Sequence, residues 1–239
     1  SHGGMEVIHD FAYKLPTIVM FDMLGIPESE IGGGMLEKLN QAISDSFIVF
    51  ETRAFSPEEL DLADRQIEFL TAFFNEHFES RRQNPQDDLM TALVASQSEE
   101  GGLTTDEASV IAIGLFGAGF ETTAHMIGNG LYSLHRYPEQ WDILCRDPGM
   151  ASNATEEVLR FESSLQATFR TALEDTEFAG GRIQKGERLL ALLAGANRDP
   201  SVYDDPDCFN IQRTPKKPLA FGGGIHFCVG AQLARIEGE

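Results

Sequence analysis

Residues 104–138 set the tightest limit on how this chain can fold, because they are typical of one unbroken helix. Thr104 and Glu107 have the spacing of a capping box, and the next strong helix-breaking signal is Tyr137-Pro138. At 1.5 Å per residue, about 30 residues make a rod of about 45 Å, longer than the usual helix of a globular protein. We therefore expect a fold built around one long central helix.

Glycines interrupt the apolar surface of this predicted helix. They lie at five interior positions: Gly114, Gly117, Gly119, Gly128 and Gly130. Each glycine costs a helix roughly 1 kcal/mol relative to alanine. A sequence selected for helix stability alone would avoid them, so we expect another group to approach the helix backbone closely.

The chain before this segment also reads as helical. Pro16 is expected to interrupt an apolar stretch over residues 6–27, and a short helix is predicted at residues 87–97. Ser56-Pro57 followed by Glu59 predicts the start of a helix, since serine suits the N-cap and proline the first turn. Apolar residues at helical spacing predict one buried stripe on that helix: Leu60, Ala63, Ile67, Leu70, Phe74 and Phe78.

The last third of the chain has a different sequence pattern. Short runs at residues 168–172 and 189–193 predict strands, and residues 197–218, with four prolines, predict a long irregular loop. We therefore predict an α+β fold, mainly α with small β-sheets. Residues 1–5 read as a tag remnant, and residues 6–239 as a single domain, helix-rich over 6–165 and mixed over 166–239.

Composition excludes several classes of partner. The chain has 38 acidic and 18 basic side chains, a net charge of −20, which argues against nucleic acid and anionic membrane surfaces. The longest apolar run, residues 108–120, is 13 residues long, whereas a membrane span needs about 20. Three cysteines without CxxC spacing favour a reduced, cytoplasmic setting.

Residues 221–235, FGGGIHFCVGAQLAR, place Cys228 among glycines and before a helix-forming run. Inward-pointing amides and the dipole of the following helix would stabilise a thiolate, and Gly230 leaves room for a flat ligand. Such a thiolate suits a soft metal or a haem iron. A zinc site made of His226, Cys228 and Cys208 would lack the standard ligand spacing. A phosphate-binding loop would need Gly-Lys-Ser/Thr after the glycines, and that sequence is absent. A catalytic cysteine and a plain turn stay open as alternative interpretations of this loop.

This stretch resembles the cysteine-ligand signature of the cytochrome P450 family in its bacterial form. The resemblance implies that Cys228 is the axial ligand of haem b (iron protoporphyrin IX) and that Phe221 packs near its sulfur. It also implies that Gly230 lies against the cofactor and that His226 and Arg170 reach the haem propionates.

Two further segments resemble the same family in the same order. Residues 118–122, AGFET, match the oxygen-activating stretch of its central helix, which implies that Ala118 and Gly119 lie against the haem face. Glu121 and Thr122 would then be an acid–alcohol pair that relays protons towards dioxygen. Taken alone, Glu-Thr on a helix is typical of a solvated face.

Glu157 and Arg160 match the ExxR motif of the family, and their spacing places both charges on one helix face. The resemblance implies that both residues contact Arg213 in the irregular loop and form with it a structural network of paired buried charges. Ser164 departs from the family pattern, which usually has proline there.

The resemblance implies a soluble, cytoplasmic bacterial oxidoreductase: a haem-thiolate monooxygenase that inserts one atom of dioxygen into a small organic substrate. Electrons would come from a ferredoxin-type redox partner. A basic cluster of Arg213, Lys216 and Lys217 is a candidate docking site for it, and a solvated loop is an equally open interpretation of that cluster. The match also implies a partial fold, truncated at both ends. The alternative function is therefore a catalytically inactive relative that acts as a binding or scaffold partner.

Overall fold

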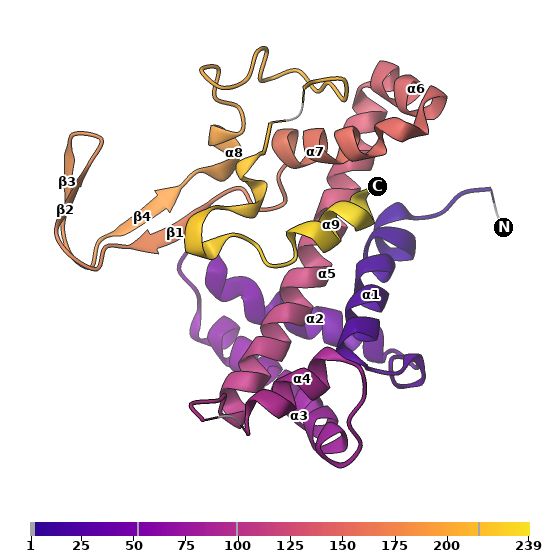
Figure 1. Cartoon of the computed structure of the whole chain (residues 1–239), viewed down its shortest axis with the longest axis vertical. Helices are drawn as coiled ribbons and strands as arrows, with labels where there is room; N and C mark the ends of the chain where they lie inside the picture. Colours follow the sequence, from indigo (N-terminus) through magenta and orange to yellow (C-terminus); the bar gives the residue numbers. More distant parts are fainter. Residues whose placement is uncertain (1–2, 52, 99, 215) are drawn as a thin grey trace. The chain divides into compact units, whose positions relative to one another are not determined.

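The computed structural model describes residues 3–51, 53–98, 100–214 and 216–239, so residues 1–2 of the predicted tag remnant lie outside the described residues. The described chain is mainly helical and carries two small antiparallel sheets (Figure 1), which confirms the predicted fold class. Its contacts form two compact units, residues 1–121 and 122–239, whose boundary falls inside the long helix α5 (Thr105–Arg136).

The first unit is built from helices. They are α1 (Lys14–Leu24), α2 (Met35–Phe47), α3 (Pro57–Gln83), α4 (Leu89–Ser96) and the first half of α5, with short helical turns at Ile8–Ala12, Glu28–Glu30 and Ile48–Phe50. A cluster of aromatic rings forms part of the core, with Phe116 lying 5.0 Å from Phe21 and 5.2 Å from Phe120 between ring centroids. The unit is therefore organised around the apolar face of α5.

Local signals set the ends of the two longest helices. Ser56 and Glu59 form the predicted capping box of α3. At the start of α5, the Glu107 N–H donates to Thr104 Oγ1 at 3.2 Å, and the Thr104 N–H donates to the Glu107 carboxylate at 2.8 Å. Both capping predictions are confirmed.

Two expectations for this unit are wrong in detail. Pro16 does not interrupt the helix, because it occupies the third position of α1. The backbone N–H groups of the first turn have no hydrogen-bond partner inside a helix, so the N–H that proline lacks costs no bond there. The stripe on α3 is only partly buried: Leu60 and Ile67 are 42% and 40% exposed. The other four stripe residues are buried.

Close packing explains two of the glycines in α5. A Cβ atom at Gly117 would lie 2.5 Å from the Phe47 ring and 2.9 Å from Ile43, and one at Gly119 would overlap the Met20 side chain. The side chains of α1 and α2 therefore approach the α5 backbone as expected. By contrast, no described atom lies within 4 Å of a Cβ placed at Gly114.

By length and composition alone, α5 could also cross a membrane. Its most apolar window of 18 residues has a mean hydropathy of 1.4. However, 44% of that window is buried inside the protein, and the core helices of soluble proteins have the same composition.

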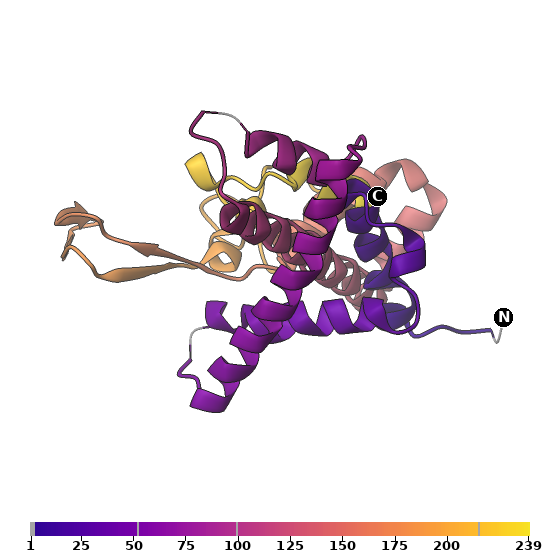
Figure 2. The ribbon, with the colours of Figure 1, turned by 90° about the horizontal axis from the view of Figure 1, so that it is seen from below.

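The second unit combines helices with two short ribbons. Its elements are α6 (Pro138–Arg146), α7 (Ala151–Phe161), α8 (Leu193–Ala196), α9 (Ala231–Gly238) and the strands β1 (Thr168–Thr171), β2 (Thr176–Phe178), β3 (Gly181–Ile183) and β4 (Arg188–Ala191). β1 pairs with β4 and β2 with β3. Figure 2 shows the β2–β3 hairpin as the continuation of the β1–β4 ribbon.

The core of this unit lies between α7 and the irregular loop. Val158 and Leu159 of α7 pack with Phe209 and Ile211 of the loop and with Met126 of α5. Residues 197–214 and 216–218 contain no helix or strand, so the predicted irregular loop is confirmed over its described residues. An irregular segment thus supplies buried core residues, and its shape must be held by side-chain contacts.

Candidate functional site

The cysteine loop is a tight backbone structure that leads directly into a helix. Gly222 and Gly224 adopt φ of +68° and +63°, the left-handed region that glycine tolerates best. The Cys228 N–H donates to the Phe221 carbonyl at 3.0 Å, and the Cys228 carbonyl accepts from Ala231 at the start of α9. The predicted helix after the cysteine is present.

Apolar side chains on this loop and on α9 are uncovered. Ile225 is 97% exposed, Val229 89% and Ile236 70%, and the Cys228 thiol itself belongs to an exposed residue. A Cβ atom at Gly230 would meet the Cys228 sulfur at 3.9 Å and no other described atom within 4 Å. This surface combines open space beside a glycine, an exposed cysteine and uncovered apolar groups. Such a surface fits a large, flat, apolar ligand that carries a metal, such as haem.

The two proposed propionate contacts lie on different elements. Arg170 is an exposed residue of β1, where its guanidinium donates to Thr168 Oγ1 at 3.2 Å and to the Phe169 carbonyl at 2.6 Å. His226 is exposed at the end of the short helical turn Gly224–His226. No group of three or more histidine, cysteine or acidic side chains suited to a metal ion occurs within the described part of the chain.

Glu121 and Thr122 follow one another on α5 and have separate partners. The Ser44 hydroxyl of α2 donates to Glu121 Oε1 at 3.3 Å. Burial, with a further contribution from the Glu121 charge, raises the pKa of Tyr13. Ser164 donates to the Thr122 carbonyl at 2.7 Å. The residue that departs from the family pattern therefore ties the turn after α7 to the backbone of α5.

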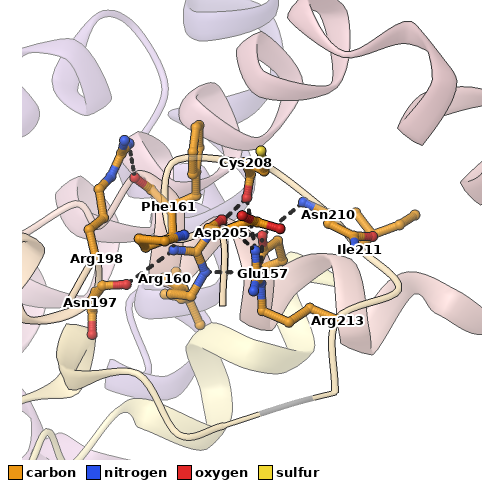
Figure 3. Close-up of polar contacts among 12 residues, drawn as sticks. Glu157, Arg160, Phe161, Asn197, Arg198, Asp205, Cys208, Asn210, Ile211 and Arg213 are labelled. Atoms are coloured by element: carbon orange, nitrogen blue, oxygen red, sulfur yellow. Dashed lines mark hydrogen bonds and ion pairs between the residues drawn. The ribbon is translucent and has the colours of Figure 1, made fainter. Parts of the chain in front are cut away.

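The ExxR residues and Arg213 meet in one buried network (Figure 3). Arg160 binds the Glu157 carboxylate through two N–H···O bonds of 2.8 Å, and Arg213 Nε lies 3.4 Å from the same carboxylate. The side chains of Arg160 and Glu157 are 2% and 4% exposed. Such a pair avoids the cost of an uncompensated buried charge only because every partner is in place.

The network holds the irregular loop by its backbone. Arg160 donates to the carbonyls of Asn197, Pro206 and Cys208 at 3.1, 2.8 and 3.0 Å. The Asn210 N–H donates to Glu157 Oε1 at 2.8 Å. Charged side chains thus replace the backbone ladder that a strand or helix would provide.

Asn197 is a site residue that the sequence pattern did not single out. It is 1% exposed, and its amide donates to Ser163 Oγ at 3.0 Å while its Oδ1 accepts from the Leu219 N–H at 2.7 Å. It therefore ties the start of the irregular loop to the segment that enters the cysteine loop. The residue was missed because its partners are distant in sequence, and no local signal marks them.

The helix after the cysteine makes two further polar contacts. Arg235 pairs with Glu156 of α7, and its guanidinium lies 4.6 Å from the centre of the Phe221 ring. Burial raises the pKa of Glu237 to about 7, while a hydrogen bond with the Thr123 side chain opposes that shift. The sequence pattern did not single out Glu237 either, because the shift of its pKa depends on packing rather than on local sequence.

Comparison with known proteins identifies the family. A sequence model described as Cytochrome P450 matches residues 35–144 and 150–239. The biotin biosynthesis cytochrome P450 of Bacillus subtilis (strain 168) is 37% identical over 237 residues, which cover 98% of this chain and 58% of that protein. A steroid C26-monooxygenase of Mycobacterium tuberculosis (strain ATCC 25618 / H37Rv) is 35% identical, with 99% and 58% covered.

Solved structures agree. The structure of P450BioI in complex with hexadec-9Z-enoic acid ligated acyl carrier protein has a TM-score of 0.89 and 37% identity, covering 98% of this chain and 59% of that one. A myxobacterial cytochrome P450, CYP267B1, in complex with myristic acid, has a TM-score of 0.88 and 39% identity, with 98% and 56% covered. This chain thus spans about 58% of the length of the curated relatives named above. The chain belongs to the cytochrome P450 family.

Proposed function

We propose that this protein is a haem-thiolate monooxygenase that inserts one atom of dioxygen into a small organic substrate, with Cys228 as the axial ligand. One observation carries the proposal. Cys228 lies exposed in a loop shaped by left-handed glycines, directly before α9 and beside uncovered apolar side chains. When bound there, haem would supply the activation of dioxygen, which no amino-acid side chain can perform.

The chain's own residues would bind and orient the cofactor. The Cys228 thiolate would hold the metal, and the N-terminal end of α9 would favour its negative charge. Phe221 would cover the sulfur, and Gly230 would leave space for a flat ring. Arg170 and His226 are the side chains that would bind the two propionates, since both are exposed and can donate hydrogen bonds.

Proton delivery would fall to Glu121 and Thr122. The Glu121 carboxylate can take a proton from water and release it, and the Thr122 hydroxyl both donates and accepts hydrogen bonds. The hydrogen bond from Ser44 would orient the Glu121 carboxylate. Oxygen-atom insertion also releases water and needs two protons, so a relay of this kind meets a chemical requirement of the reaction.

The relatives suggest the kind of substrate and partner. Two similar structures hold a fatty acid or a fatty acyl group, and another relative is named as a steroid monooxygenase. We infer a substrate with an apolar body. A ferredoxin-type partner would supply electrons in the bacterial cytoplasm, and the exposed Lys216 and Lys217 would attract its acidic surface. Arg213, the third member of the basic cluster, is paired with Glu157 instead.

The test is an optical spectrum of the protein reconstituted with haem, reduced and exposed to carbon monoxide. The wild-type chain should give the red-shifted band of a ferrous thiolate complex. Cys228→Ala should lose it. Cys145→Ala, which removes an exposed thiol of α6, is the matched control and should keep it. A band that survives in Cys228→Ala would remove that residue from the role. A wild-type chain that binds no haem would support the inactive scaffold instead.

A further inference from the structure

The turn that follows α7 is hydrogen-bonded to the backbone and side chains of α5. Ser164 Oγ donates to the Thr122 carbonyl at 2.7 Å. The Asn129 side-chain amide donates to the Glu162 carbonyl at 3.0 Å. Thr122 and Asn129 are seven residues apart on α5, about two helical turns, so they lie on one face of the helix. The turn therefore contacts α5 at two points, and one of them is a residue of the proposed proton relay.

The turn is itself held in place by its neighbours. Ser163, the residue before Ser164, is 1% exposed, and its hydroxyl donates to the Leu159 carbonyl of α7 at 2.5 Å. The Asn197 amide donates to Ser163 Oγ at 3.0 Å, and the Gln166 amide donates to the Ser163 carbonyl at 2.5 Å. The Ser164 hydroxyl is thus presented to α5 from a backbone that α7 and the irregular loop fix.

A donor from outside the helix constrains the peptide group of Thr122. Within an α-helix, each carbonyl accepts from the N–H four residues later. A carbonyl oxygen has a second lone pair, which the Ser164 hydroxyl can use. Because threonine is β-branched, its side chain has few rotamers in a helix. A constraint on the Thr122 peptide group therefore also restricts where the Thr122 hydroxyl lies.

We propose that Ser164 is a positioning residue for Thr122, whose carbonyl it holds through this hydrogen bond. Proline, which the family pattern usually has at this position, carries no hydroxyl and could not make the contact. The contact therefore belongs to this chain rather than to the family motif. Its effect on proton delivery rests on the proposed function, whereas the hydrogen bond itself can be tested without haem.

The first test is nuclear magnetic resonance of the full chain, labelled with carbon-13 and nitrogen-15, without cofactor. The carbonyl carbon of Thr122 is observed through the amide of Thr123. Ser164→Ala should move that resonance upfield, because the carbonyl loses a donor, and Ser164→Thr should keep it near the wild-type position. The matched control is Ser201→Ala, which removes an exposed hydroxyl bonded to Asp199 and should leave the resonance unchanged. An unmoved resonance in Ser164→Ala would refute the contact.

The second test uses the haem-loaded protein and measures hydrogen peroxide formed per reductant consumed. A hydrogen bond contributes about 1 kcal/mol, so Ser164→Ala should raise this ratio by up to about fivefold. Ser164→Thr should restore the wild-type ratio, and Ser201→Ala should match wild type. A loss of stability alone would reduce the amount of haem-bound protein but would leave the ratio unchanged.

The same substitution in a Thr122→Ala background shows whether Ser164 acts through Thr122. Ser164→Ala should then add nothing to the ratio, since the hydroxyl that it positions is absent. An equal increase in both backgrounds, or none in either, would overturn the proposal. A wild-type chain that binds no haem would instead refute the proposed function. The Thr122 carbonyl resonance alone would then decide whether Ser164 positions this residue.

Discussion

Replacing Glu157 with glutamine should remove much of the stability of the second unit. The change keeps the size of the side chain but removes the charge that neutralises Arg160, whose side chain is 2% exposed. Both 2.8 Å bonds from Arg160 and the contact from Arg213 lose their carboxylate. Breaking a buried pair by removing one partner costs about 3–5 kcal/mol. A typical domain has about 5–15 kcal/mol in total, so this loss is large.

Urea unfolding followed by circular dichroism would measure the effect. With a slope of about 2 kcal/mol per molar urea, the midpoint for Glu157→Gln should fall by about 1.5–2.5 M. The matched control is Asp142→Asn, which removes the same charge from a pair with Arg146 that is 65–79% exposed. That control should shift the midpoint by less than about 0.5 M, since exposed pairs contribute little. A Glu157→Gln midpoint as close to wild type as the control would refute the reasoning.

Three further outcomes are expected. Thr122→Ala should retain haem but divert electrons to hydrogen peroxide, measured as peroxide formed per reductant consumed; unaltered coupling would exclude the relay. Gly117→Ala should lower the free energy of unfolding by about 1–3 kcal/mol, because its Cβ would lie 2.5 Å from Phe47, whereas Gly114→Ala should raise it by up to about 1 kcal/mol. Stability should fall as pH rises from 4.5 to about 7, because folded Glu237 keeps a proton that the unfolded chain has lost; solvent screening should hold the loss below about 3 kcal/mol, and Glu237→Gln should remove it.

Local rules predicted the helix boundaries well and the packing only in part. The capping boxes at Ser56 and Thr104 depend on residues three positions apart, so they can be found in sequence alone. The effect of Pro16 was predicted wrongly, because it depends on which turn of the helix the proline occupies. The glycines of α5 correctly indicated a close approach, but not that Phe47 would meet Gly117. That contact joins segments 70 residues apart, and no periodic pattern encodes it.

The candidate site shows the same division. Motif resemblance named Glu157, Arg160 and Arg213, and the structure brings them into contact. It did not find Asn197, whose role depends on burial, or Glu237, whose pKa is raised by burial. Burying a polar group without a hydrogen-bond partner costs roughly 2–7 kcal/mol, so its role depends on what the fold places around it. Residues of this kind become visible only when their surroundings are known.

The ExxR pair and the cysteine loop, 68 residues apart, are connected by hydrogen bonds rather than by regular structure. Arg160 donates to the Asn197 carbonyl, and the Asn197 side chain accepts from the Leu219 N–H. Leu219 begins the turn that ends at Phe221, whose carbonyl accepts from the Cys228 N–H. Each step fixes the backbone that makes the next one possible. A buried ion pair adds little net stability to a protein, because desolvation offsets the attraction between its charges. Here the geometry of the pair determines where an irregular segment places the Cys228 thiol.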